Sequence, residues 1–254
     1  MSAPTVSRIY VYPIKSLGRV EVAESAFVPG GGLAHDREFA LFNPNGDVMT
    51  MKREPGFHRI DAKYDLKAFT VTLEGDRFHL LDDRPELERW FSDAFGFAVT
   101  MRRDTKTGFP DDLESPGPTI VSEATLAEVN AWFPELDRDQ VARRFRANIE
   151  IGGVPAFWED RLFGEPEEVV GFRVGDVAFQ GNNPCARCAV PSRHPDTGDV
   201  NAEFQKVFRE KREETLPNGV ALGRFNHFYR LCVNTRVPGA ETGKVIKVGD
   251  AIKT

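Results

Sequence analysis

The sequence predicts a mainly β protein with three or four helices, an α+β fold made of two β-rich domains, barrel-like or sandwich-like. Short runs of β-branched and aromatic residues recur along the 254-residue chain, and most are bounded by turn-forming residues. Helical periodicity is limited to a few segments, and no repeat with solenoid spacing occurs. Residues 104–118 are rich in Gly, Pro and Asp, which is typical of a long connection. We therefore expect an N-terminal domain over residues 1–110 and a C-terminal domain over residues 111–254.

The N-terminal half is predicted to consist of short strands joined by tight turns. Asn45-Gly46 is a hairpin signal, because both residues tolerate positive φ. A helix is expected over residues 85–95, with Pro85 in its first turn and apolar residues at helical spacing. The expected strands cover residues 6–12, 20–28, 39–42, 48–52, 69–73 and 77–81.

The C-terminal half is predicted to begin with a helix that Ser122 caps and that continues to about Phe133. Gly175-Asp176 is predicted to form the turn of a hairpin, and a second Val-Gly-Asp turn is expected at residues 248–250. Turn formers at residues 181–184 indicate a loop that leaves the hairpin. The expected strands cover residues 145–151, 172–174, 177–180 and 225–234.

Composition excludes several classes of protein. The 39 acidic residues outnumber the 33 basic ones, and a net charge of -6 has the wrong sign for general binding to nucleic acid. The N-terminal residues lack a signal-peptide pattern, and no 18-residue apolar stretch occurs, so no membrane association is expected. Three cysteines cannot form a disulfide framework and suit a reducing compartment. We expect a cytoplasmic protein.

Cys185-Ala186-Arg187-Cys188 is the segment with the clearest chemical potential. The charge of Arg187 favours the thiolate, the form of cysteine that attacks electrophiles and binds metals. A structural zinc site would need four ligands, and the remaining cysteine, Cys232, lies in an apolar run that indicates a buried residue. A thioredoxin-like pair would need a following helix, which Pro191 disfavours.

Basic residues near predicted strand ends form a second group of candidates. Lys15, Arg37 and the arginines at 143, 144 and 146 suggest an anion site, because Arg pairs with phosphate through two parallel hydrogen bonds and Lys acts as a point charge. The alternative is solvated surface charge. His194 follows Cys188 closely, but the sequence does not establish a Cys-His nucleophilic pair. No phosphate-loop, dinucleotide-binding or metalloprotease motif occurs.

Five short motifs in a fixed order resemble the MOSC family, named for the C-terminal domain of molybdenum cofactor sulfurases, together with its N-terminal β-barrel partner domain. Within that family the chain looks most similar to the mitochondrial amidoxime-reducing component and its bacterial relatives. The motifs are Tyr12-Pro13-Ile14-Lys15-Ser16, Asp36-Arg37-Glu38-Phe39, Ser122-Glu123-Ala124-Thr125-Leu126, Phe145-Arg146-Ala147-Asn148-Ile149, and Cys185-Ala186-Arg187-Cys188 followed by His194-Pro195-Asp196-Thr197-Gly198.

The resemblance implies a pterin-based molybdenum cofactor whose metal takes one protein cysteine as a ligand. Cys188 matches that position and would be both metal ligand and catalytic residue, which is reasonable for a soft thiolate. Cys185 has no role in this scheme. By the same resemblance, seven residues hold the pterin and its phosphate: Lys15, Ser16, Arg37, Ser122, Arg146, Asn148 and Arg187.

Members of this branch reduce N-hydroxylated small molecules by cleaving N–O bonds, so the resemblance implies an oxidoreductase. With Cys188 used as a ligand, two cysteines are too few for an iron–sulfur cluster, and a separate flavoprotein, ferredoxin or cytochrome would supply electrons. No pyridoxal phosphate is expected. One alternative is a sulfur-handling or cofactor-carrier protein in which Cys188 holds a persulfide or the cofactor without turnover. A third is a non-catalytic binding domain with a thiol-sensing loop.

Overall fold

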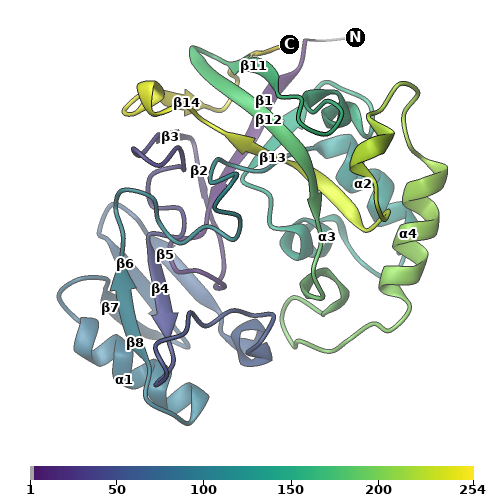
Figure 1. Ribbon diagram of the computed structural model, residues 1–254. Coiled ribbons are helices and arrows are strands. Elements are labelled where there is room, and N and C mark those ends of the chain that lie inside the picture. The colour runs from purple at the N-terminus through teal and green to yellow at the C-terminus, as the bar shows by residue number, and fades with distance from the viewer. Residues whose placement is uncertain (1–2) are drawn as a thin grey trace.

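The computed structural model describes residues 3–254 and forms a larger and a smaller lobe (Figure 1). Within these residues the mainly β fold with few helices, predicted from the sequence, is confirmed: fifteen strands accompany four α-helices. The strands are β1 (Thr5–Val11), β2 (Val20–Val22), β3 (Glu24–Ala26), β4 (Phe39–Phe42), β5 (Ala62–Asp65), β6 (Thr70–Leu73), β7 (Asp76–His79), β8 (Thr100–Arg103), β9 (Ile120–Ser122), β10 (Ile149–Gly152), β11 (Val170–Val174), β12 (Val177–Ala186), β13 (Arg230–Arg236), β14 (Val245–Lys247) and β15 (Ile252–Lys253). The α-helices are α1 (Arg84–Phe95), α2 (Glu123–Trp132), α3 (Arg138–Phe145) and α4 (Phe204–Glu214).

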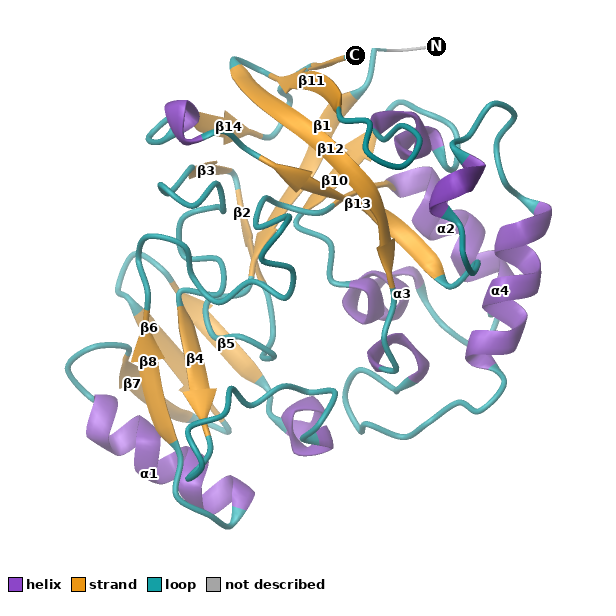
Figure 2. Ribbon diagram, in the orientation of Figure 1, coloured by secondary structure: helices purple, strands orange, loops and turns teal. Residues whose placement is uncertain are grey.

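The larger lobe is organised by an eight-stranded open sheet in the order β15-β11-β12-β13-β9-β10-β1-β2. β1 and β2 come from the N-terminal part of the chain, so this sheet takes strands from both sides of residues 104–118. β9 and β10 are parallel, and their crossover contains α2 and α3. Figure 2 shows these helices and α4 gathered beside the sheet. The division at residues 110 and 111 stays a prediction.

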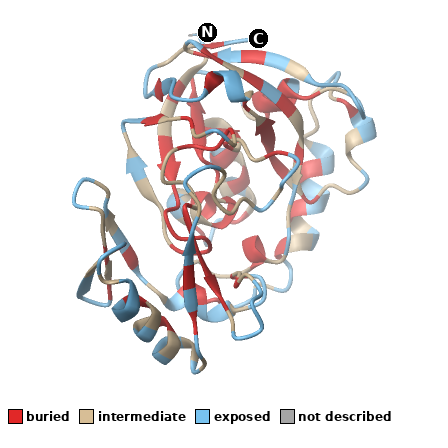
Figure 3. Cartoon of the chain, turned by 60° about the vertical axis from the view of Figure 1, so that its left-hand side comes forward, coloured by how far each residue is buried: buried red, intermediate tan, exposed pale blue. Residues whose placement is uncertain are grey.

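The smaller lobe contains a three-stranded sheet, β5-β6-β7, and the β4-β8 pair, with α1 packed beside them. Its core includes Phe57, Leu87, Phe91 and Met101, all almost fully buried. The larger lobe has one apolar core on its sheet and another among α2, α3 and α4. Buried residues accordingly concentrate inside each lobe in Figure 3. None of the helices in residues 3–254 is long and apolar enough to cross a membrane.

Several predicted elements differ in extent from those observed. The strand expected over residues 145–151 is wrong at its start, because α3 continues to Phe145 and β10 begins only at Ile149. Asp137 and Gln140 form a capping box that starts α3, and Phe145 packs in the helical core. The strand expected over residues 48–52 is reduced to one bridge, between Phe42 and Val48.

The loop expected at residues 181–184 is also wrong, since β12 continues to Ala186. Pairing with β13 holds this stretch in the sheet, and two register irregularities accommodate its turn-forming residues. α4 had no counterpart among the predicted elements; it buries Phe204, Phe208 and Arg212 along one face.

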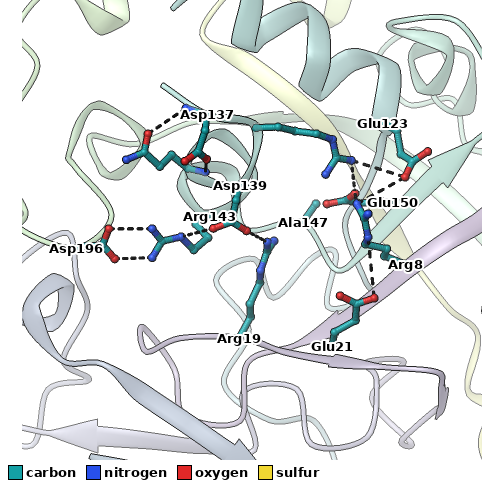
Figure 4. Close-up of polar contacts among 12 residues, drawn as sticks. Arg8, Arg19, Glu21, Glu123, Asp137, Asp139, Arg143, Ala147, Glu150 and Asp196 are labelled. Carbon is teal, nitrogen blue, oxygen red and sulfur yellow. Dashed lines mark hydrogen bonds and ion pairs between the residues drawn. The ribbon is translucent and has the colours of Figure 1, made fainter. Parts of the chain in front are cut away.

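A buried carboxylate fastens β10 to β1 and to α3. Glu150 is 1% exposed and accepts hydrogen bonds from Arg8 Nη1 at 3.2 Å and Arg138 Nη2 at 2.6 Å (Figure 4). Glu123 Oε1 lies 3.6 Å from Arg8 Nη1 and 3.7 Å from Arg138 Nη2. Because a buried charge that loses its partner is strongly destabilising, this network holds the start of α3 against the sheet.

Gly181 provides a test of the close packing between β12 and the turn at residues 158–162. A Cβ at Gly181 would lie 1.6 Å from the carbonyl oxygen of Leu162, whereas a Cβ at Gly171 would meet nothing within 4 Å. We expect Gly181→Ala to lower the free energy of unfolding by about 1–3 kcal/mol through overpacking. Gly171→Ala, on the neighbouring strand, should change it by less than about 0.5 kcal/mol. Urea unfolding measures both, and equal effects would contradict the close approach.

Candidate functional site

A cavity of about 1040 Å³ is lined by residues from both lobes. Its wall carries lysine or arginine at eight positions and carboxylates at three, although the whole chain has a net charge of -6. Seven of the eight candidate residues line it, and they are Lys15, Ser16, Arg37, Arg146, Asn148, Arg187 and Cys188. The fold therefore concentrates positive charge around an exposed thiol.

The ring of Tyr12 supports two of the cavity's arginines. The guanidinium carbons of Arg146 and Arg37 lie 4.1 and 5.2 Å from the ring centroid. The Tyr12 hydroxyl donates to the carbonyl of Ala147 at 3.2 Å, and its backbone N–H donates to Asp36 Oδ1 at 2.9 Å. Tyr12 thus links the strand β1 to both arginine-bearing loops and fixes the spacing of their charges.

Three cavity residues have left-handed backbone conformations, which are uncommon outside glycine. The φ angles are 71° for Ser16, 50° for Arg37 and 53° for Arg146. Arg146 ends α3 in this conformation, so its side chain leaves the helix toward the cavity. Strained backbone of this kind concentrates at binding and catalytic sites, where the surrounding structure has to maintain it.

Lys15 is held by an ion pair at the cavity wall. Its Nζ donates to the Phe109 carbonyl at 2.9 Å and contacts the carboxylate of Asp111. Burial lowers the pKa of Lys15, and Asp111 acts against that shift. Burial acts to raise the pKa of Asp111, but the charges of Lys15 and Arg37 outweigh it and lower that pKa to about 2. Arg37 is itself paired with Asp36.

Arg146 and Arg187 have no carboxylate within ion-pair distance in the described part of the chain. Arg146 Nη2 donates to the Leu17 carbonyl at 2.9 Å. Arg187 Nη1 donates to the Phe145 carbonyl at 3.0 Å, and its Nη2 donates to the Leu231 carbonyl at 2.8 Å. Burial lowers the pKa of Arg146, and the charge of Arg37 adds to this effect. Two guanidinium charges on this wall therefore have no carboxylate ion-pair partner among the described residues.

The uncharged polar residues among the predicted site residues already form hydrogen bonds within the fold. Asn148 Nδ2 donates to the Tyr10 carbonyl at 3.1 Å, while its Oδ1 accepts from Thr119 N at 3.2 Å. Ser16 Oγ accepts from Met51 N at 3.1 Å. Ser122 is fully buried, does not line the cavity, and caps α2 by accepting from Thr125 N at 3.0 Å. The capping role predicted for Ser122 is therefore confirmed, and the residue lies outside the wall of the cavity.

The three cysteines occupy different environments. Cys188 is exposed on the cavity wall, in the segment that follows β12, and its Sγ accepts a weak hydrogen bond from Val190 N at 3.5 Å. Cys185 is half-buried within β12. Cys232 is buried, and burial raises the pKa of its thiol to about 12. Residues 190–192, just after Cys188, form only a short 3-10 helix, so this pair lacks the helix of a thioredoxin-like site.

Several lining residues were missed by the sequence analysis. Asp111 lies in the segment interpreted as a connection between domains. It is 96 residues away from Lys15 in the sequence, so no local pattern indicates that the two form an ion pair. Asn234 and Arg230 lie on β13, where alternation indicated only a strand. Arg144 was noted as one of a basic group, and it reaches the cavity from α3.

The fold and this cavity define a class of protein: a two-lobed, mainly β chain that offers an anionic ligand a basic wall beside one exposed thiol. The chain belongs to the MOSC family. It matches the MOSC domain over residues 119–253, more than half of its length, and the MOSC N-terminal beta barrel domain over residues 3–80. The family that the sequence motifs indicated is therefore confirmed.

Relatives of two kinds align with most of the chain. The molybdenum cofactor sulfurase of Danio rerio is 25% identical over 87% of this chain and 32% of its own length. The mitochondrial amidoxime reducing component 2 of Rattus norvegicus is 25% identical over 90% of this chain and 73% of its own. The chain thus spans about a third of the sulfurase. Among solved structures, the YUAD protein from Bacillus subtilis aligns over 99% of this chain and 94% of that one, with a TM-score of 0.41 and 13% identity.

The different environments of the thiols predict selective labelling. At pH 8 we expect Ellman's reagent to react fastest with Cys188, because it is exposed. Cys232 should stay unreacted in the folded protein, because it is buried with a thiol pKa of about 12. Cys188→Ser should abolish the fast phase and Cys185→Ser should retain it. A fast phase that survives in Cys188→Ser would contradict the assignment, and denaturant should release all three thiols.

Proposed function

We propose that this protein is a molybdenum-cofactor-dependent oxidoreductase that reduces N-hydroxylated or otherwise N-oxygenated small molecules. The observation that carries the proposal is the presence, on one cavity wall, of an exposed thiol and of the guanidinium groups of Arg146 and Arg187, which have no carboxylate partners among the described residues. An anionic pterin that carries a metal matches both features. Its phosphate would neutralise the cations, and Cys188 would bind the metal.

The residues present fit such a cofactor in size and in chemistry. A cavity of about 1040 Å³ is at the upper end of the range usual for ligand and cofactor sites. Lys15, Arg37 and Arg146 would hold the phosphate by charge-assisted hydrogen bonds. Within residues 3–254 no three His, Cys, Asp or Glu side chains gather as a metal site, so a metal bound at Cys188 would take its other ligands from the cofactor.

In the proposed reaction an amidoxime takes up two electrons and two protons and yields an amidine and water. The bound cofactor would supply the two-electron chemistry of N–O cleavage. The chain's own contribution is to orient the cofactor through Cys188 and the basic wall, and to keep substrate near the exposed thiol. The electrons would come from a separate flavoprotein, ferredoxin or cytochrome. Support comes from the relative named amidoxime reducing component, which aligns with 90% of this chain.

A second candidate function is cofactor or sulfur handling without turnover. It is favoured by the alignment with molybdenum cofactor sulfurases over 85–87% of this chain. In that case Cys188 would hold a persulfide or the cofactor for delivery. Protein purified from a cofactor-competent host separates the two functions. Near-stoichiometric molybdenum with amidoxime reduction by an artificial electron donor supports the oxidoreductase, whereas bound metal without turnover supports the carrier.

The role of Cys188 is tested against its neighbour. We expect Cys188→Ser to lose amidoxime reduction and most of the bound molybdenum, because a hydroxyl is a poor replacement for a soft thiolate ligand. Cys185→Ser should retain both the activity and the bound molybdenum, since Cys185 lies within β12 and is only partly accessible. Metal analysis and steady-state assays measure the effects. If Cys185→Ser lost the activity and the molybdenum while Cys188→Ser kept them, Cys185 would be the metal ligand.

The basic wall is tested through cofactor retention. Arg146→Ala and Lys15→Ala should each weaken retention roughly tenfold to a hundredfold, because each removes a charge-assisted hydrogen bond of about 1.5–3 kcal/mol. Arg89→Gln, an equal loss of charge on the exposed face of α1, is the matched control and should have no effect. Molybdenum content after gel filtration is the readout. Wild-type occupancy in Arg146→Ala would refute the phosphate assignment.

A further inference from the structure

A second, smaller pocket shares part of its wall with the main cavity. It has a volume of about 150 Å³, and the two pockets share Arg144, Arg146 and Ser16 on their walls. His58 and Arg193 line this second pocket and do not line the main cavity. The volume is well below that of a pocket for a drug-sized ligand and suits a group of a few heavy atoms.

The carboxylates around the second pocket are already paired. Asp196 binds Arg143 through two hydrogen bonds, at 2.5 and 2.8 Å, and Asp139 lies between Arg143 and Arg19 (Figure 4). Asp61 pairs with the exposed Lys63 at 3.0 Å. Arg143 and Arg19 are therefore neutralised, and no carboxylate of the wall remains for the other cations.

Four arginines of this wall have no carboxylate partner in the described residues: Arg59, which is exposed, and Arg144, Arg146 and Arg193. Arg144 is 5% exposed, and its Nη1 donates to the Pro191 carbonyl at 2.7 Å. Arg193 Nη1 donates to the Gly198 carbonyl at 3.0 Å. The Nε atoms of Arg144 and Arg193 are buried without a hydrogen-bond partner. An anion in the pocket would satisfy these donors and offset the guanidinium charges, because unpaired buried donors and charges are destabilising.

His58 adds an uncharged donor to the same wall. The residue is 6% exposed, and both ring nitrogens are buried without a hydrogen-bond partner among the described residues. Burial lowers the pKa of His58 to about 4, the charge of Arg193 adds to this effect, and the nearby backbone of Pro195 acts against it. A neutral imidazole carries one N–H, which suits an acceptor oxygen between the arginines.

We propose that this pocket, lined by Arg144, Arg146, Arg193 and His58, is a second anion site that binds a tetrahedral oxyanion of the phosphate class. Phosphate offers several acceptor oxygens to the free Nε atoms of Arg144 and Arg193 and to the imidazole N–H, and its charge offsets the guanidinium charges of the pocket. The phosphate group can be free, as inorganic phosphate or a small monoester, or can belong to a larger ligand in the main cavity that passes Arg146. The site does not depend on the proposed reaction.

The test uses the cofactor-free full chain and inorganic phosphate as the probe, by isothermal titration calorimetry. Lys15→Ala serves as the background, because Lys15 lines only the main cavity. In this background we expect one phosphate per chain. Arg193→Gln should weaken it about tenfold or more by removing a charge-assisted contact. His58→Phe, which keeps an aromatic ring in the core, should weaken it as well, and Arg89→Gln should not.

Two results would overturn the proposal: no phosphate binding in the Lys15→Ala background, or binding that neither Arg193→Gln nor His58→Phe weakens. Thermal unfolding of each variant shows that it is folded before titration. The molybdenum content of Arg193→Gln from a cofactor-competent host identifies the source of the phosphate. If Arg193→Gln loses both the cofactor and phosphate binding, the phosphate group in the pocket belongs to the cofactor. If it keeps the cofactor and loses only phosphate binding, the phosphate group belongs to a free ligand. If the chain binds no molybdenum at all, the calorimetry still decides the anion site.

Discussion

The antiparallel pairing of β1 with β10 is the constraint on which the candidate site depends. Ile9 pairs with Ile149. The Asn148 side-chain amide donates to the Tyr10 carbonyl at 3.1 Å, and the Asn148 backbone carbonyl accepts from Tyr10 N at 2.7 Å. This register brings the segment after β1, with Tyr12 and Lys15, beside the end of α3. A slip by one residue would turn these side chains to the opposite face of the sheet and separate the cations of the two segments.

Tyr12 and the strained backbone then determine how closely the charges approach. An acidic chain keeps a basic cavity because it pairs its surface charges among themselves and leaves Arg146 and Arg187 without carboxylates. Backbone carbonyls and the Tyr12 ring orient these guanidinium groups without neutralising them. Arg144 and Arg146 line both pockets, so one arrangement of charge can serve two anion sites.

Much of the fold was predictable from local patterns. Turn residues located the hairpin around Gly175 and Asp176, and Ser122 correctly marked the start of α2. Patterns failed where a distant partner overrides a local preference. Residues 181–184 look like a loop, yet pairing with β13 extends β12 through them. α3 has few apolar residues, and its burial depends on a core that α2 and α4 complete. The register of β12 with β13 cannot be read from either strand alone.

The sequence by itself determined the mainly β class, the family motifs and the distinction of Cys188 from Cys232, because turn chemistry, motif spacing and local hydrophobicity are local properties. The tertiary structure alone decided which of the motif residues meet. It placed seven of the eight candidates around one cavity, left Ser122 outside that cavity, and added Asp111 as the partner of Lys15. The physical reason is that ion pairing and burial act through space between residues far apart in the chain, so the charge that remains unpaired is known only when every neighbour is in position.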